Sequence, residues 1–208
     1  MLKIIAPKRQ RKSILEVVNQ NNSLIFIILC YIIGILCGVL FFKYNNQNGL
    51  YYYNEFNKLY EELKSGFAVN FGLALLRQLP YAAAVFLAGS SMIGVVIAPA
   101  VTCLRGATYG IIMSYTCNAF GLMGIVFNLL ILIPPAVISA IAIILSSRES
   151  FGFSLCLARL ALPNCTTPKI DKDFKLFCLR QIFVFLFFLA AALLEGFMAT
   201  SFTPFFNL

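Results

Sequence analysis

The chain contains no histidine and few charged residues, and both shortages exclude broad classes of function. Lys, Arg, Asp and Glu make up 12% of the 208 residues, against roughly a quarter in an average soluble domain. Without histidine there is no material for a Cys-His catalytic pair or a histidine-liganded zinc site. So little charge cannot cover a water-soluble globule, and the apolar excess must therefore face lipid.

Catalytic motifs are also missing. There is no P-loop, no nucleophile elbow, no HExxH and no paired carboxylate in a recognisable cleft. The neighbours Glu61 and Glu62 are no substitute, because adjacent helical side chains point about 100° apart. The seven cysteines show no CxxC spacing and are interpreted as structural and reduced. We expect no enzyme activity, no metal site and no cofactor.

Apolar residues account for 61% of the chain and gather in stretches of the length that crosses a bilayer, about 20 residues. The first is too long for a signal-peptide core and is interpreted as a retained span. The sequence thus predicts an all-α integral membrane protein, a single polytopic domain of about five transmembrane helices, at residues 23–43, 80–99, 100–120, 121–146 and 176–200.

Glycine and proline set the predicted boundaries. Pro80 is placed at the start of the second span, where its missing N–H costs nothing. Pro99 is placed in the turn to the third span, and Gly121 separates the third span from the fourth.

Three segments lie between or before these spans. Residues 1–22 form a basic tail, and residues 147–175 a loop with two proline breakers. Residues 44–79 form an amphipathic segment, whose apolar positions recur at helical spacing from Phe56 to Phe67. We expect it to contain a short interfacial helix, followed by an in-plane elbow over 67–79.

The distribution of basic residues predicts the orientation. The net charge is +8, but no basic stretch is interleaved with aromatics as in nucleic-acid binding. With the N-terminus cytoplasmic and five spans, twelve of the sixteen Lys and Arg residues fall in cytoplasmic segments. Basic residues concentrate on the cytoplasmic side of membrane proteins. The sequence therefore predicts a cytoplasmic N-terminus, an extracytoplasmic C-terminus and no nucleic-acid partner.

Ionisable residues in or beside the spans are the first candidates for function. We expect Glu195 to pair with Arg77 near the outer surface, with Lys43 as its second choice, and Arg105 to pair with Glu149 near the inner surface. Pairing lowers the cost of placing a charge near lipid. The alternative is that each long basic side chain extends to the headgroups on its own.

Two further features leave alternatives open. Gly34 and Gly38 have the spacing that lets two helix backbones approach closely, either as a seam within the chain or between copies in a homo-oligomer. Pro134 and Pro135 bend the fourth predicted span. The bent helix either lines a substrate path or only packs.

Several short motifs resemble the stage II sporulation protein M family of endospore-forming bacteria and their relatives. They are the basic residue and glycine at Arg105-Gly106, Gly110 four residues later, the stretch Phe120-Gly121-Leu122-Met123-Gly124, the proline at Ile133-Pro134, and the acidic site Leu194-Glu195-Gly196. The resemblance covers nearly the whole chain, but Pro135 stands where family members often have a polar residue.

The resemblance implies a five-span protein of the bacterial cell membrane, in the mother-cell engulfing or septal membrane. It implies a non-enzymatic scaffold that localises the peptidoglycan-degrading stage II sporulation proteins D and P, which would supply the hydrolytic chemistry. The alternative is a permease-type subunit that works with an ATPase partner. A third possibility is a related role outside sporulation.

Overall fold

Every element of the structure is a helix. The computed structural model describes residues 22–44, 61, 66–160 and 170–202, and within these ranges it contains no strand. This confirms the all-α prediction. The elements are α2 (Asn22–Tyr44), α4 (Phe67–Gly89), α5 (Gly94–Phe127), the π-helical segment η2 (Asn128–Leu132), α6 (Ile133–Leu160) and α7 (Ile170–Phe202).

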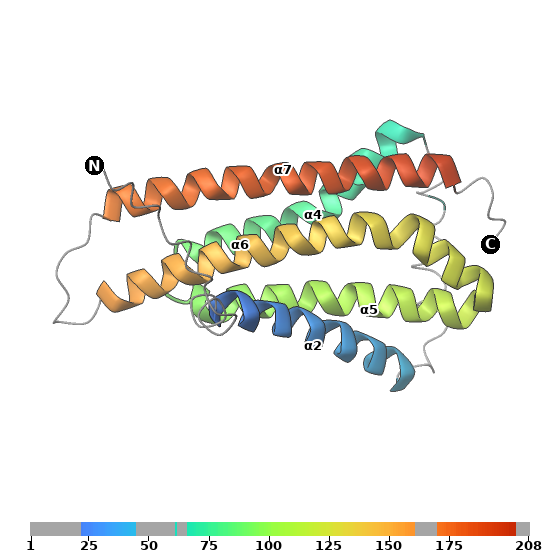
Figure 1. Cartoon of the computed structure of the whole chain (residues 1–208), viewed down its shortest axis with the longest axis horizontal. Helices are drawn as coiled ribbons and strands as arrows, with labels where there is room; N and C mark the ends of the chain where they lie inside the picture. The colour runs from blue at the N-terminus through green and yellow to red at the C-terminus, as the bar shows by residue number, and fades with distance from the viewer. Residues whose placement is uncertain (1–21, 45–60, 62–65, 161–169, 203–208) are drawn as a thin grey trace, which may run out of the picture.

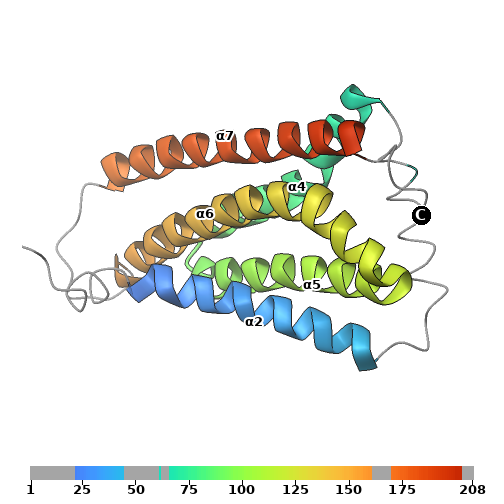
Figure 2. The same ribbon diagram turned by 45° about the vertical axis from the view of Figure 1, so that its right-hand side comes forward.

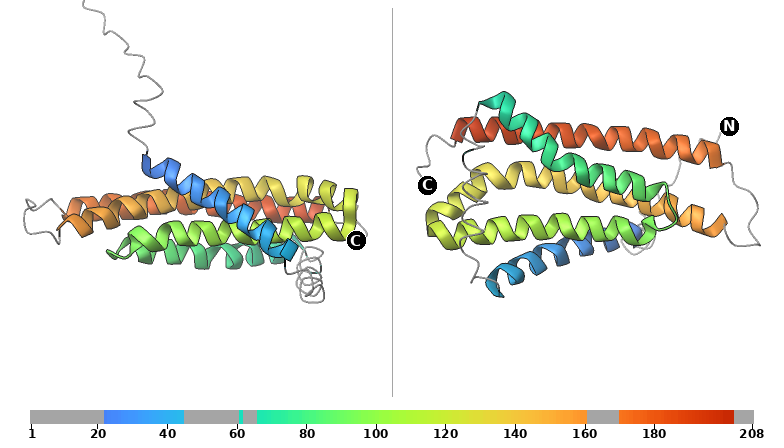
Figure 3. Two further views of the ribbon diagram at one scale, coloured as in Figure 1. Left: turned by 90° about the horizontal axis from the view of Figure 1, so that it is seen from below. Right: turned by 180° about the vertical axis from the view of Figure 1, so that it is seen from behind.

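The helices form one bundle, with their axes running roughly along its long dimension (Figures 1 and 2). Helix α6 contacts α2, α4, α5 and α7, and so lies at the centre. Helix α2 packs against α5 and crosses it obliquely, while the first turns of α4 cross α7 (Figure 3). The bundle has two ends, which we name after the turns that lie there. The Gly121 end holds the break at Gly121 within α5, and the Ser91 end holds the turn between α4 and α5.

The chain reverses direction at Gly121. This residue has φ 55° and ψ −129°, inside an otherwise continuous helical run. Glycine is the residue that adopts such a conformation without steric cost. Just beyond it, a Cβ on Gly124 would collide with the backbone carbonyl of Thr116, because the two arms of the turn touch. Residues 94–120 therefore run towards the Gly121 end, and η2 and α6 return from it.

Four stretches are long and apolar enough to cross a membrane. They are Asn22–Tyr44, Phe67–Gly89, Gly94–Ala158 and Asp173–Phe202, of which the third contains the reversal at Gly121. Large apolar side chains are exposed along them, on α2 and α7 above all, as with Leu36 and Ile182. A helix with apolar residues around its whole circumference is typical of a membrane span.

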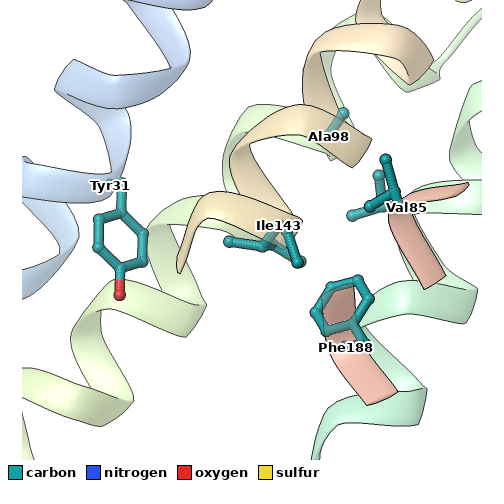
Figure 4. Packing of buried hydrophobic residues seen from close by; sticks show 7 residues of the cluster. Tyr31, Val85, Ala98, Ile143 and Phe188 are labelled. Atoms are coloured by element: carbon teal, nitrogen blue, oxygen red, sulfur yellow. The ribbon is translucent and has the colours of Figure 1, made fainter. Parts of the chain in front are cut away.

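The core holds the five long helices together at one point. Figure 4 shows Tyr31, Val85, Ala98, Ile143 and Phe188, each from a different helix, in one buried cluster. A second cluster of Phe127, Ile131, Leu132 and Ala199 lies nearer the Gly121 end, on the α5–η2 segment and α7.

The predicted boundaries around Pro80 and Pro99 are wrong. Both prolines lie inside helices, and the turn consists of Ser90, Ser91 and the two residues before Gly94. The Gly94 N–H donates to the carbonyl of Ser91 at 3.1 Å, and the Ile93 N–H donates to the Ser91 hydroxyl at 3.3 Å. Membrane helices tolerate internal proline because neighbouring groups satisfy the freed backbone.

Two predicted connecting segments are largely helical instead. Residues 67–79 are the first half of α4 rather than an in-plane elbow. Most of the predicted loop 147–175 belongs to α6 and α7, because its serines face the protein interior and not water. The basic tail and the predicted interfacial helix lie outside the described residues, apart from a few positions such as Glu61.

Candidate functional site

A salt bridge joins α4 and α7 within the bundle. The Nη2 atom of Arg77 donates to Oε1 of Glu195 at 2.7 Å, with the two side chains 31% and 16% exposed. This is the first pair that the sequence predicts, and the structure contains it. On the same two helices, Phe67 of α4 packs against Gly196 of α7. A Cβ added to Gly196 would lie 3.3 Å from the Phe67 ring. The pair therefore stands where α4 and α7 pack tightly.

Arg77 lies deeper than the sequence indicates. It is ten residues from the start of α4 and twelve from its end, so about 15 Å and 18 Å from the two ends of the helix. The sequence predicts a position near the membrane surface because Pro80 resembles the beginning of the span. The longer helix places a permanent charge in the middle of α4.

Arg105 also lies in a helix interior, not in an entry turn. It is eleven residues beyond Gly94, about 16 Å along α5, and it is 9% exposed. Its Nη2 donates to the Tyr109 hydroxyl at 3.0 Å. Its guanidinium carbon lies 4.8 Å from the ring centre of Tyr81 and 4.7 Å from that of Tyr109. Two aromatic faces thus hold this cation.

The predicted pair of Arg105 with Glu149 is wrong. Glu149 Oε2 accepts instead from Arg180 Nη1 at 2.7 Å, which links α6 to α7. The register of α5 on α6 explains this, since Thr102 lies opposite Ser147 with their hydroxyl oxygens 2.6 Å apart. Arg105 is therefore level with residue 144, and Glu149 lies about 7 Å further towards the Ser91 end.

A chain of hydrogen bonds leads from Arg105 into α6. A guanidinium can only donate, so the Tyr109 oxygen accepts from Arg105. The Tyr109 hydroxyl lies 2.8 Å from the Ser139 hydroxyl, which in turn lies 3.3 Å from the carbonyl of Ala136. Donation therefore runs from Arg105 through Tyr109 and Ser139 to the backbone.

Gln78 adds a fully buried amide beside these groups. It follows Arg77 in the chain and precedes Tyr81 by one helical turn, and it is 1% exposed. Among the described residues, neither its Nε2 nor its Oε1 has a hydrogen-bond partner. We name the whole set the central polar cluster: Arg77, Gln78, Tyr81, Arg105, Tyr109, Ser139 and Glu195.

Only the three charged members of this cluster were candidates from the sequence. The spacing of Arg105 and Tyr109, four residues apart on one helix face, is a local signal that could have identified the tyrosine. Gln78 and Ser139 carry no such signal, because a single polar residue in an apolar run does not show which way it faces.

A ladder of buried serines runs along α6 towards the Ser91 end. Ser150 donates to the carbonyl of Val85 at 2.9 Å and Ser154 to that of Gly89 at 3.1 Å, which ties α6 to α4. Gln181 of α7 joins the same ladder through Ser146 and Ser150. Ser150 and Ser154 fall in the loop that the sequence predicts over residues 147–175. Their spacing over 139, 146, 150 and 154, at seven, four and four residues, is the missed helical signal.

The predicted glycine seam exists within one chain. Gly34 and Gly38 of α2 lie against Gly106 and Gly110 of α5. A Cβ on any of the four would collide with a backbone carbonyl of the facing helix, respectively those of Cys103, Ala107, Tyr31 and Ile35. Since α5 occupies the α2 glycines, they are not available to a second copy.

Pro134 and Pro135 follow the π-helical segment η2 at the start of α6. Two consecutive residues without an N–H remove two helical hydrogen bonds. The amide of Asn128 fixes this segment to α5, accepting from Thr116 at 2.8 Å and donating to the carbonyl of Met113 at 3.3 Å. These contacts hold the segment that precedes the two prolines against α5.

The remaining polar chemistry in the described ranges is sparse. No three His, Cys, Asp or Glu side chains come together there as a metal ion would require. The six cysteines in those ranges are free thiols. A polar hollow of about 340 Å³ opens near the Ser91 end, with Arg148, Asp173 and Arg180 in its lining.

A family model described as stage II sporulation protein M matches residues 27–200 of the chain. The matched range extends from the first turns of α2 to the end of α7 and includes every residue of the central polar cluster. No curated protein matches the chain, and no solved structure matches it.

Proposed function

Because the chain belongs to the stage II sporulation protein M family, we propose that it is a non-enzymatic scaffold of sporulation that localises peptidoglycan hydrolases at the cell membrane. The observation that carries the proposal is the family match over residues 27–200. The proposed partners are the stage II sporulation proteins D and P, and the proposed location is the engulfing or septal membrane of the mother cell.

The proposed topology has five crossings with a cytoplasmic N-terminus. The reversal at Gly121 divides the stretch Gly94–Ala158 into two antiparallel passes. Together with one pass for each of the other three stretches, this makes five crossings. Arg77 and Arg105 lie towards the middle of the bundle and so count towards neither side. The other basic residues still divide eleven to three in favour of the side that holds the N-terminus.

In this orientation the Gly121 end faces the cell wall. The chain between Tyr44 and Gly66 leaves and re-enters the bundle at that end. It is longer than the connection at residues 161–169 on the other side, and its sequence has an amphipathic pattern. We infer that residues 45–65 provide the surface for an extracytoplasmic partner.

The test is co-purification of the tagged protein from sporulating cells in mild detergent, with partners identified by mass spectrometry. Three proteins are compared: the natural chain, a variant with residues 45–65 replaced by a neutral linker, and a control with residues 161–169 replaced. Both replacements stop short of the helices, so that Arg77 and the salt bridge remain. We expect wall hydrolases with the natural chain and the control, and none with the 45–65 variant.

One result would contradict the scaffold role, and another would contradict the assignment of the binding surface. Recovery of an ATPase without any wall enzyme would indicate a transport subunit. Equal recovery of hydrolases with both replacement variants would move the binding surface away from residues 45–65 while leaving the scaffold role in place.

A further inference from the structure

The two hairpin helices α4 and α5 bring Gln78 and Arg105 to the same depth. Gln78 lies eleven residues before Gly89, where α4 ends, and Arg105 lies eleven residues after Gly94, where α5 begins. The same symmetry places Val85 level with Ala98, and these two are in one buried cluster. Gln78 and Arg105 thus occupy matching positions on the buried faces of two helices in contact.

Arg105 carries a charge that its neighbours only partly compensate. An arginine side chain stays protonated in proteins. Both salt bridges within the described residues involve other partners, and Arg105 has one hydrogen bond and two tyrosine faces. Contact with aromatic faces stabilises a desolvated cation by less than the burial of an ion costs. The guanidinium still has N–H groups that need acceptors.

Gln78 needs a donor and an acceptor at once. Its Oε1 and Nε2 are both buried and have no partner in the part of the chain that the structure describes. A buried polar group without a partner destabilises the folded state. An anion such as chloride could accept from Nε2 and from the guanidinium, but it could not donate to Oε1. Water can do both, and buried waters usually make two to four hydrogen bonds to such groups.

We propose that Gln78 and Arg105 bind ordered water between α4 and α5, in a site bounded by the rings of Tyr81 and Tyr109. The site lies at the start of the hydrogen-bond chain that continues through Tyr109 and Ser139 into α6. Water there supplies the amide and guanidinium hydrogen bonds that the helices do not. This inference is independent of the scaffold role.

Hydroxyl-radical footprinting with a synchrotron X-ray pulse tests the site on the purified full-length protein. Radicals formed from bound water label the side chains beside it, even where bulk solvent does not enter. Tyr81 and Tyr109 are both partly buried, so the reference is Tyr115, a partly buried tyrosine packed against the apolar cluster of Phe127. We expect Tyr81 and Tyr109 to be labelled several-fold faster than Tyr115. Labelling of both tyrosines at the rate of Tyr115 would overturn the proposal, whatever any variant shows.

A substitution then assigns the water to Gln78. Gln78→Met keeps the length of the side chain and removes both hydrogen-bonding atoms, so we expect the labelling of Tyr81 and Tyr109 to fall several-fold. Gln181→Met is the matched control, because Gln181 already has protein partners in Ser146 and Ser150. Unchanged labelling in a folded Gln78→Met variant would overturn the assignment to Gln78.

The melting temperature gives a second readout. If the amide is hydrated, Gln78→Met loses hydrogen bonds and lowers the melting temperature, as Gln181→Met does. If the amide is dry, methionine relieves a buried group that has no partner and raises the melting temperature. A raised melting temperature would therefore count against the bound water.

Discussion

Arg77 and Glu195 are 118 positions apart in the chain, yet their side chains meet at 2.7 Å across α4 and α7. The pair is partly buried in a region where the surrounding helices are apolar. It therefore links the middle of α4 to the last turns of α7.

Replacing Glu195 with glutamine is expected to destabilise the protein by about 2 kcal/mol. The value lies between that of an exposed pair, at most about 1 kcal/mol, and that of a broken buried pair, about 3–5 kcal/mol. Thermal unfolding in detergent measures it. Arg77→Gln together with Glu195→Gln should cost less than the sum of the two single changes. Additive effects would show that the two side chains do not interact.

The glycine seam predicts opposite effects of one substitution at two sites. Gly34→Ala places a methyl group on the carbonyl of Cys103 and should destabilise by about 1–3 kcal/mol, because the backbone has to move. Gly72→Ala, where a Cβ meets nothing within 4 Å, should be neutral or stabilise by up to about 1 kcal/mol. Melting curves of the two variants make the comparison. Equal melting temperatures would exclude the close approach of α2 to α5.

The serine ladder predicts a modest loss on removal of one hydroxyl. Ser150→Ala loses the bond to the carbonyl of Val85 and the one from Gln181, and should cost about 1 kcal/mol. Ser90 is the control, since its exposed hydroxyl donates to the carbonyl of Leu87 in the last turn of α4 and does not join two helices. Ser90→Ala should leave the melting temperature nearly unchanged. A similar loss in both variants would mean that the ladder does not join the helices.

The topology predicts which side each turn faces. Single cysteines are introduced into a cysteine-free variant at Leu122, which is 82% exposed beside Gly121, and at Met92, which is 52% exposed in the other turn. An impermeant maleimide applied to intact cells should label the cysteine at 122, and the one at 92 only after permeabilisation. The reverse result would invert the orientation.

Much of the architecture follows from composition and pattern alone. The scarcity of charge and the long apolar runs require helices in lipid, because a backbone that crosses a bilayer must satisfy its own hydrogen bonds. The break at Gly121 and the glycine spacing at Gly34 and Gly38 are local properties of the chain. The pair Arg77–Glu195 could be predicted because few charges were present to choose from.

Other features required the tertiary structure. Pro80 and Pro99 resemble helix boundaries in sequence, but packing keeps both inside helices and so moves Arg77 and Arg105 towards the middle of the bundle. Arg105 lies against two tyrosine rings instead of Glu149 because the register of α5 on α6 places that carboxylate about 7 Å away. The buried faces of Gln78 and Ser139 likewise depend on which helix lies opposite. Composition determined that this chain folds as apolar helices, whereas register between the helices decided which of its few polar groups meet.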